Sequence, residues 1–211
     1  MKKVSYLGAG LVAAGVVLSY GATVFAQSAS ETELTQVINA GTLHTDIVDG
    51  SGSTVTAPTV AMSIADTSVA EQTTTGQYGT SGERIYINNP GAADNGWNLT
   101  VAASGGPTAL WQDGTKTFDY NDPGAAGQLT LDPSVSTITP VSPGTLTGIT
   151  KGTSAAFVQG TTDAITLASA GASSGSVWEG SITGIGVSQK IPASQEPGQY
   201  KIKLTQTLTA Q

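Results

Sequence analysis

The sequence predicts an all-β protein, organised as a single β-sandwich of the immunoglobulin-like or Greek-key type with long polar loops. Two observations predict this class. Short runs in which apolar and polar residues alternate recur along the chain, as expected of half-buried strands. Gly, Pro, Asn and Asp interrupt these runs at hairpin spacing, and no run shows the 3.6-residue apolar period of an amphipathic helix. The sequence therefore favours stacked antiparallel sheets.

Residues 1–26 are expected to be a cleaved signal peptide, which leaves residues 27–211 as a single all-β domain. The leader has a basic start at Met1-Lys2-Lys3, an apolar run from Leu7 to Leu18 and small residues around Val24-Phe25-Ala26. An uncleaved N-terminal helix is the alternative. We expect no membrane span after cleavage, and any attachment to a surface would be non-covalent because the chain stops directly after a strand.

Charge and cysteine content exclude several functions. Eight Lys and Arg stand against 15 Asp and Glu, and the formal net charge is −7. Nucleic acid is a poor partner for such a chain, because its binding depends on clustered basic residues. The chain has no cysteine, which excludes disulfides and thiolate metal sites.

The first half of the chain divides into short segments. The spacing of apolar residues predicts strands at 42–47, 54–56, 58–69 and 83–88. A hairpin turn is expected at Asp49–Gly52, and Gln72–Gly82 is expected to be a Thr/Gly-rich loop.

We expect the chain to be organised around the segment Asn88–Val101. Its turn-rich beginning leads into a run in which Trp97, Leu99 and Val101 alternate with polar residues. Further strands are expected at 109–112, 129–131, 155–158, 164–168, 177–191 and 200–208. Asp113–Gly127 is a polar insertion, and the Pro-rich Asp132–Gly144 is expected to run over the surface.

The residues give little indication of catalysis, and we expect no enzyme. His44 is the sole histidine, and no G-x-S-x-G nucleophile motif occurs. No cofactor is expected, with calcium as the one candidate. Oxygens of Asp119, Asn121 and Asp122 are of the kind that calcium prefers, but Pro123 occupies the next ligand position and no bidentate Glu follows. A turn stabilised by the Asp side chains is the alternative.

The three tryptophans Trp97, Trp111 and Trp178 admit two interpretations. A flat indole ring with a polar edge could stack on a sugar, and a tryptophan could equally belong to the core.

Gly96-Trp97-Asn98-Leu99-Thr100-Val101 resembles the first signature of the WxL domain family. The closing part of the chain, from Ile191-Pro192-Ala193 through Tyr200 to Leu208, is similar to that family's closing segment. Here Gln206 stands in place of the second tryptophan. By alternation it shares a face with Tyr200, Ile202, Leu204 and Leu208.

This resemblance implies a secreted bacterial protein of the cell surface that attaches non-covalently to the wall by binding peptidoglycan or another surface component. Trp97 and Leu99 would form the first binding site, and Thr207 and Leu208 the second. The alternative function is a structural subunit of a surface fibre or layer, which would self-associate by strand exchange.

Overall fold

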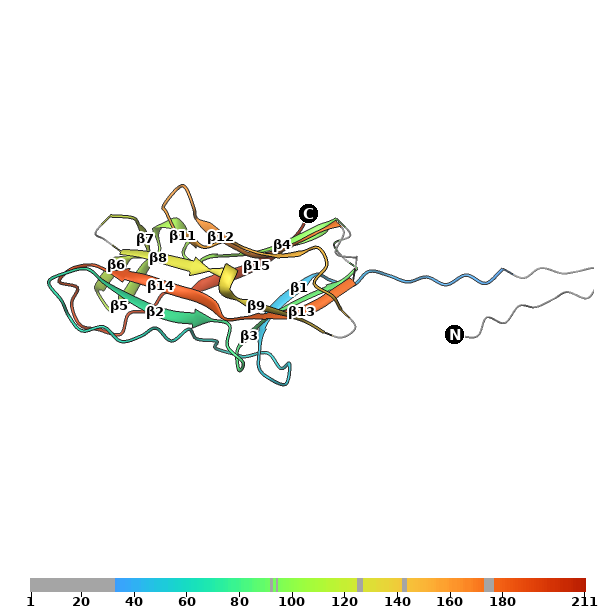
Figure 1. Cartoon of the computed structure of the whole chain (residues 1–211), viewed down its shortest axis with the longest axis horizontal. Coiled ribbons are helices and arrows are strands. Elements are labelled where there is room, and N and C mark those ends of the chain that lie inside the picture. Colours follow the sequence, from blue (N-terminus) through green and yellow to red (C-terminus); the bar gives the residue numbers. More distant parts are fainter. Residues whose placement is uncertain (1–32, 92, 94, 125–126, 142–143, 173–176) are drawn as a thin grey trace, which may run out of the picture. The chain divides into compact units, whose positions relative to one another are not determined.

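The computed structural model describes residues 33–91, 93, 95–124, 127–141, 144–172 and 177–211. Asn39–Gln211 form one compact unit, and residues up to Ile38 belong to a separate one. The expected signal peptide, residues 1–26, lies outside the described residues. Within the described part of the chain, no helix is long and apolar enough to cross a membrane. Residues 39–211 are built from antiparallel strands (Figure 1), and the predicted all-β, sandwich-like class is confirmed.

One layer of the fold contains two antiparallel sheets. The first has the order β1 (His44–Val48), β3 (Arg84–Pro90), β13 (Val177–Thr183), β9 (Thr137–Pro140). The second has the order β11 (Ala155–Ala156), β8 (Gly127–Asp132), β14 (Ile185–Ile191), β2 (Gln72–Tyr78), with β7 (Asn121–Asp122) also paired to β8.

These two sheets are halves of one long layer. Only Gly184 separates β13 from β14, and this long strand pairs with β3 and β2 on one side and with β9 and β8 on the other. Gly184 has φ +79°, and its N–H donates to the carbonyl of Gly79 at 2.6 Å. The short 3-10 helix η2 (Pro133–Val135) interrupts the third strand, between β8 and β9. The three long strands of this layer, β3 with β2, β13 with β14 and β9 with β8, are therefore each interrupted where the two sheets meet.

The second layer has the order β10 (Ile149–Lys151), β12 (Ala164–Gly171), β4 (Gly96–Ala103), β15 (Leu204–Ala210). β4 is central and pairs with β12 and β15. A short 3-10 helix, η1 (Gly106–Thr108), leads into the hairpin β5 (Leu110–Asp113) and β6 (Lys116–Asp119). Backbone groups of Gln112 and Lys201 bond each other, so the strand that ends in β15 runs along both β4 and β5.

The core fills the space between the layers. Trp97 of β4 lies against Trp178 of β13, with ring centroids 5.5 Å apart. The N–H of Trp178 donates to the carbonyl of Thr145 at 2.8 Å. The largest fully buried side chains besides Trp97 come from both layers: Tyr120, Phe157, Ile85, Ile87, Leu99, Leu129, Leu131, Leu167, Ile182, Ile185 and Gln189. Removal of these groups from water is the main source of the fold's stability.

Several sequence expectations were wrong. The Pro-rich segment Asp132–Gly144 was expected to run over the surface, but Thr137–Pro140 form β9, which pairs with β13, and the side chain of Ile138 is buried. Gln72–Gly82 was expected to be a loop, but Gln72–Tyr78 form β2, a strand rich in Thr and Gln whose seven residues pair with β14. Thr is β-branched and suits a half-exposed strand, and the alternation of large apolar residues is absent because this strand lies at an edge. The expected strand over 58–69 is reduced to one bridge, Met62 to Gly76, and Ile64 is 97% exposed.

Candidate functional site

The structure places the first predicted site residues, Trp97 and Leu99, inside the core. Both side chains are fully buried on β4, between the flanking strands β12 and β15. The indole N–H of Trp97 has no hydrogen-bond partner among the described residues. In this conformation neither side chain presents a surface on which a glycan could stack, and both contribute by packing.

Thr207 and Leu208 lie on β15, which is an edge strand. Leu208 pairs with Leu99, and Thr207 with Thr100. The side chain of Leu208 is half-buried and packs against the core, whereas Thr207 faces outward and is exposed. Leu99 and Leu208 are therefore brought together, but the four predicted residues do not form one surface.

The other edge of β15 is open. The backbones of Lys203 and Gln211 bond to β4 and its extension, so the odd-numbered residues of this strand face β4. The N–H and C=O groups of Leu204, Gln206, Leu208 and Ala210 face away, and no hydrogen bond joins them to any described residue. We call these four residues the open edge.

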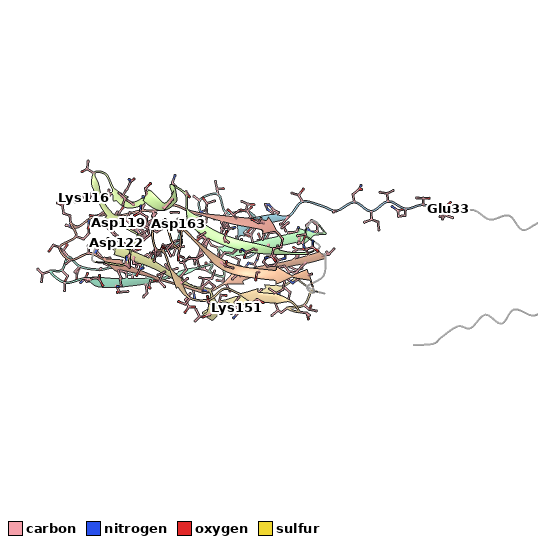
Figure 2. The ribbon with its side chains drawn as sticks, turned by 90° about the horizontal axis from the view of Figure 1, so that it is seen from above. Glu33, Lys116, Asp119, Asp122, Lys151 and Asp163 are labelled. Carbon is pink, nitrogen blue, oxygen red and sulfur yellow. The ribbon has the colours of Figure 1, made fainter. Side chains whose placement is uncertain are left out.

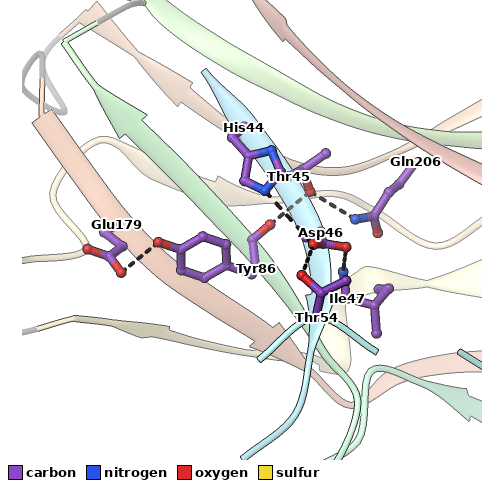
Figure 3. A network of polar contacts seen from close by, with 8 residues as sticks. All are labelled: His44, Thr45, Asp46, Ile47, Thr54, Tyr86, Glu179 and Gln206. Carbon is purple, nitrogen blue, oxygen red and sulfur yellow. Dashed lines mark hydrogen bonds and ion pairs between the residues drawn. The ribbon is translucent and has the colours of Figure 1, made fainter. Parts of the chain in front are cut away.

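Gln206 connects β15 to the opposite layer. Its side-chain oxygen accepts a hydrogen bond from the hydroxyl of Tyr78 at 2.9 Å, and its side-chain nitrogen donates to the hydroxyl of Thr45 at 2.9 Å. Thr45 donates in turn to the carbonyl of Tyr86 at 2.8 Å (Figure 3). Burial raises the pKa of Tyr78 to about 12, so its phenol stays protonated and can donate. A polar residue is tolerated on this inward face because its partners are polar.

His44 and Tyr86 lie in the same network of polar groups (Figure 3). The hydroxyl of Tyr86 donates to Glu179 at 2.7 Å, and Nε2 of His44 lies 4.0 Å from the carboxylate of Asp46. Burial raises the pKa of Tyr86 to about 12, and the Glu179 carboxylate adds to the shift. His44 is exposed on β1, at the start of its strand.

A groove of about 720 Å³ opens between the two layers beside the beginning of β15. One wall is formed by Pro58, Val60 and Met62, and the other by Ile202, Leu204 and Gln206. Its floor is formed by the core residues Leu129, Leu131 and Val187. We call this space the interlayer groove. At this groove the two layers leave part of the apolar interior accessible.

A second hollow of about 590 Å³ adjoins the groove and shares Trp111 and Tyr200 with it. Trp111 stacks on Phe118 at 5.8 Å between ring centroids, and Tyr200 meets the edge of Phe118 at 5.0 Å. We call these three residues the aromatic cluster. The N–H of Trp111 donates to the side-chain oxygen of the buried Gln189 at 2.8 Å, which fixes the orientation of the half-exposed indole.

The calcium candidates lie at one end of the compact unit, where Figure 2 labels Asp119 and Asp122. The carboxylate of Asp122 accepts from the N–H of Gly124 at 2.7 Å, as in the expected turn. The buried Asn121 donates from its side-chain nitrogen to the carbonyl of Pro107 at 2.8 Å. Over the described ranges, no group of three or more His, Cys, Asp or Glu residues could hold a metal. Calcium stays a prediction, tested by a thermal shift on adding the ion that Asp119→Ala abolishes.

Sequence reasoning missed Tyr78, Thr45 and Pro58 as neighbours of Gln206 and the groove. They come from three segments far from β15 in sequence, and Tyr78 ends the strand that was expected to be a loop. The one available signal was Gln206 itself, since a polar residue on an apolar face requires polar partners.

The fold and this site define an all-β, sandwich-like protein with an open edge strand beside an apolar groove. No family model matches the chain, and no curated protein and no solved structure matches it.

Proposed function

We propose that this chain is a secreted bacterial surface protein that acts by binding, without catalysis, as a structural subunit of a fibre or layer. Each subunit would accept a strand from a partner at the open edge of β15. The observation that carries the proposal is the edge itself. From Leu204 to Ala210 it contains no charged residue and no proline, although its backbone groups are free to pair.

The other edges of the two layers are short or partly covered in the described part of the chain. At β1, the N–H of Val55 bonds to the carbonyl of Ile47. β9 ends at Pro140, and β10 has three residues and carries Lys151. β11 has two residues, and β2 is partly covered because the N–H of Ser63 bonds to the carbonyl of Thr75. Short strands, prolines, lysines and covering segments are the usual devices against edge pairing. β15 lacks them, which favours an edge that is used.

The interlayer groove supports the same function. A strand added to the open edge would continue the sheet of β4 and β15 and would turn alternate side chains toward the apolar floor. Such addition combines backbone hydrogen bonds with burial of apolar side chains, which stabilise a complex together.

Proline at position 208 tests this function. The N–H of Leu208 faces the open edge, so Leu208→Pro removes no bond to β4 but blocks a donor that an added strand needs. Leu208→Ala is the matched control, because it loses the same half-buried side chain and keeps the N–H. Light scattering after size-exclusion chromatography of residues 27–211 should show mass rising with concentration for the wild type and for Leu208→Ala, but not for Leu208→Pro. Circular dichroism checks that both variants keep their strands. A wild type that stays monomeric at all concentrations would refute the proposal.

Non-covalent attachment to the cell wall is the second candidate, supported by the resemblance to WxL domains and by the aromatic cluster. With Trp97 and Leu99 buried, the half-exposed ring of Trp111 is the surface best suited to a sugar. Wild-type protein should then pellet with peptidoglycan sacculi. Trp111→Ala should abolish pelleting, and Tyr86→Ala, which removes a ring from the outer face of β3, should not. Equal pelleting of both variants would exclude the cluster as the wall site.

A further inference from the structure

The extended segment Glu33–Ile38, which we call the arm, carries a near copy of the edge strand's sequence. The arm contains Leu34-Thr35-Gln36-Val37-Ile38, and β15 contains Leu204-Thr205-Gln206-Thr207-Leu208. The first three residues are identical, and the last keeps an aliphatic side chain. From this match we infer that the arm of one copy adds as a parallel strand to the open edge of β15 in a second copy. The inference names the partner for the proposed function and therefore rests on it.

The arm has the properties of a segment that can add to the edge of another sheet. It forms no helix or strand in the structure, and Leu34 and Ile38 are both 89% exposed. Large aliphatic side chains at that exposure gain free energy when they are buried. Leu34, Gln36 and Ile38 alternate with Thr35 and Val37, so a single strand would place the first three on one face.

That face matches the inward face of β15. Leu204, Gln206 and Leu208 are half-buried and point between the layers, while Lys203, Thr205 and Thr207 are exposed. In a parallel pair in register, residues with equivalent positions lie side by side on the same face. Leu34 would then join Leu204 over the interlayer groove, and Ile38 would lie beside the half-buried Leu208. Gln36 would lie beside Gln206, as in the glutamine ladders of in-register sheets.

Charge determines the direction of the added strand. In the parallel register, Glu33 of the arm lies beside Lys203, on the exposed face of both strands. The same alignment continues in sequence to Glu31 and Lys201. In an antiparallel register centred on the two glutamines, Glu33 would instead lie beside the uncharged Thr209. Of these two registers, the parallel one pairs opposite charges, and neighbouring opposite charges on adjacent strands are stabilising.

A second copy is the partner that these features select, because every copy carries both the arm and the open edge. Binding of one surface to a different surface on the next copy is heterologous, and such contacts propagate as open chains when the rotation does not close a ring. The assembly would grow as a fibre, with each arm seated in the next subunit.

The first experiment uses a chain of residues 27–211 in which two exposed aliphatic side chains of the arm are replaced by serine. Leu34→Ser with Ile38→Ser should abolish the concentration-dependent increase in mass without changing the melting temperature, because both side chains are exposed in the free chain. Val69→Ser is the matched control, since Val69 is 92% exposed and lies outside the arm and the groove. If the serine variants still assemble, the arm inference is overturned and the open edge accepts some other strand. If the wild type does not assemble, both the inference and the proposed function fail.

A charge exchange tests the register. Glu33→Lys alone or Lys203→Glu alone should weaken assembly by about two- to fivefold, the range for an exposed ion pair, and the two together should restore it. No recovery in the double variant would overturn the parallel register.

Cysteine pairs test direction and partner together, in a chain that has no cysteine of its own. Thr35→Cys with Thr205→Cys should form disulfides between chains on mild oxidation, giving ladders of multimers on a non-reducing gel. Thr35→Cys with Thr207→Cys, which an antiparallel register would favour, should not. Disulfides of the first pair within single chains would show that the arm folds onto its own β15, and would overturn the role of a second copy.

Discussion

Replacement of Gln206 by Ala should weaken the connection between the two layers at the open edge and so lower the free energy of unfolding. The variant removes the two side-chain hydrogen bonds that join β15 to Tyr78 and Thr45, each 2.9 Å long. A hydrogen bond contributes about 1 kcal/mol net, and partners left unsatisfied in a half-buried site raise the loss. Loss of the side chain's packing adds a smaller term. We expect the free energy of unfolding to fall by about 2–3 kcal/mol.

Urea unfolding followed by tryptophan fluorescence measures this change, because Trp97 and Trp178 lie in the core between the same layers. Gln77→Ala is the matched control: Gln77 is exposed on β2, and its loss should change stability by less than about 0.5 kcal/mol. A double-mutant cycle of Gln206→Ala with Tyr78→Phe isolates one of the two bonds and should give a coupling of about 1 kcal/mol.

A change within about 0.5 kcal/mol for Gln206→Ala, or a coupling near zero, would refute this reasoning. It would mean that water replaces the side chain at no loss and that β15 is held by β4 alone. Gln206→Trp, which introduces a large aromatic residue at this position, should also destabilise the fold. An indole has one donor and no acceptor, so it would leave the hydroxyl of Tyr78 without its partner.

Three further predictions follow from residues in the core and at its margins. Trp97→Ala should lower the free energy of unfolding by about 3–5 kcal/mol in urea titrations, because the side chain is fully buried; an unchanged melting temperature would contradict its place in the core. Gly96→Ala should cost about 3 kcal/mol or more, because φ is +109° and a Cβ would lie 2.0 Å from the carbonyl oxygen of Ala170, whereas Gly82→Ala, with open space around it, should be nearly neutral. The raised pKa of Tyr78, about 12 in the folded state against about 10 when unfolded, contributes stability that is present below pH ~10 and lost as pH rises through ~12. Because the unfolded chain releases the proton first, Tyr78→Phe should reduce the fall in stability over that interval, and an equally steep fall would exclude Tyr78 as a cause.

Alternation of apolar and polar residues predicted the strands that face the core from one side. The run from Trp97 to Val101 became part of β4, and Ile202, Leu204, Gln206 and Leu208 do share the less exposed face of their strand. The same signal failed for β2, where Thr and Gln supply most side chains. Edge strands bury little apolar surface, so their sequences need no apolar alternation.

The candidate site was less predictable than the fold. Alternation shows that Trp97 and Leu99 share a face, but a second layer decides whether that face is covered, and the second layer comes from distant strands such as β13. The interlayer groove likewise combines segments around Pro58, Tyr78 and Leu204 that only the tertiary fold brings together. Gln206 was the exception, because alternation alone placed this polar residue on the face of Ile202, Leu204 and Leu208, where the structure finds it.

The ladder between β15 and β4 has a mechanical consequence. Seven residue pairs, from Leu204 with Ala103 to Ala210 with Trp97, hold β15 in place. A pull directed along the strand loads all of these pairs together in shear, whereas a pull across the sheet would open them one after another. A neighbour that grips β15 lengthwise would therefore transmit tension through the most resistant direction of the sheet. In the proposed assembly, force would then enter each copy along β15, beside the buried Trp97.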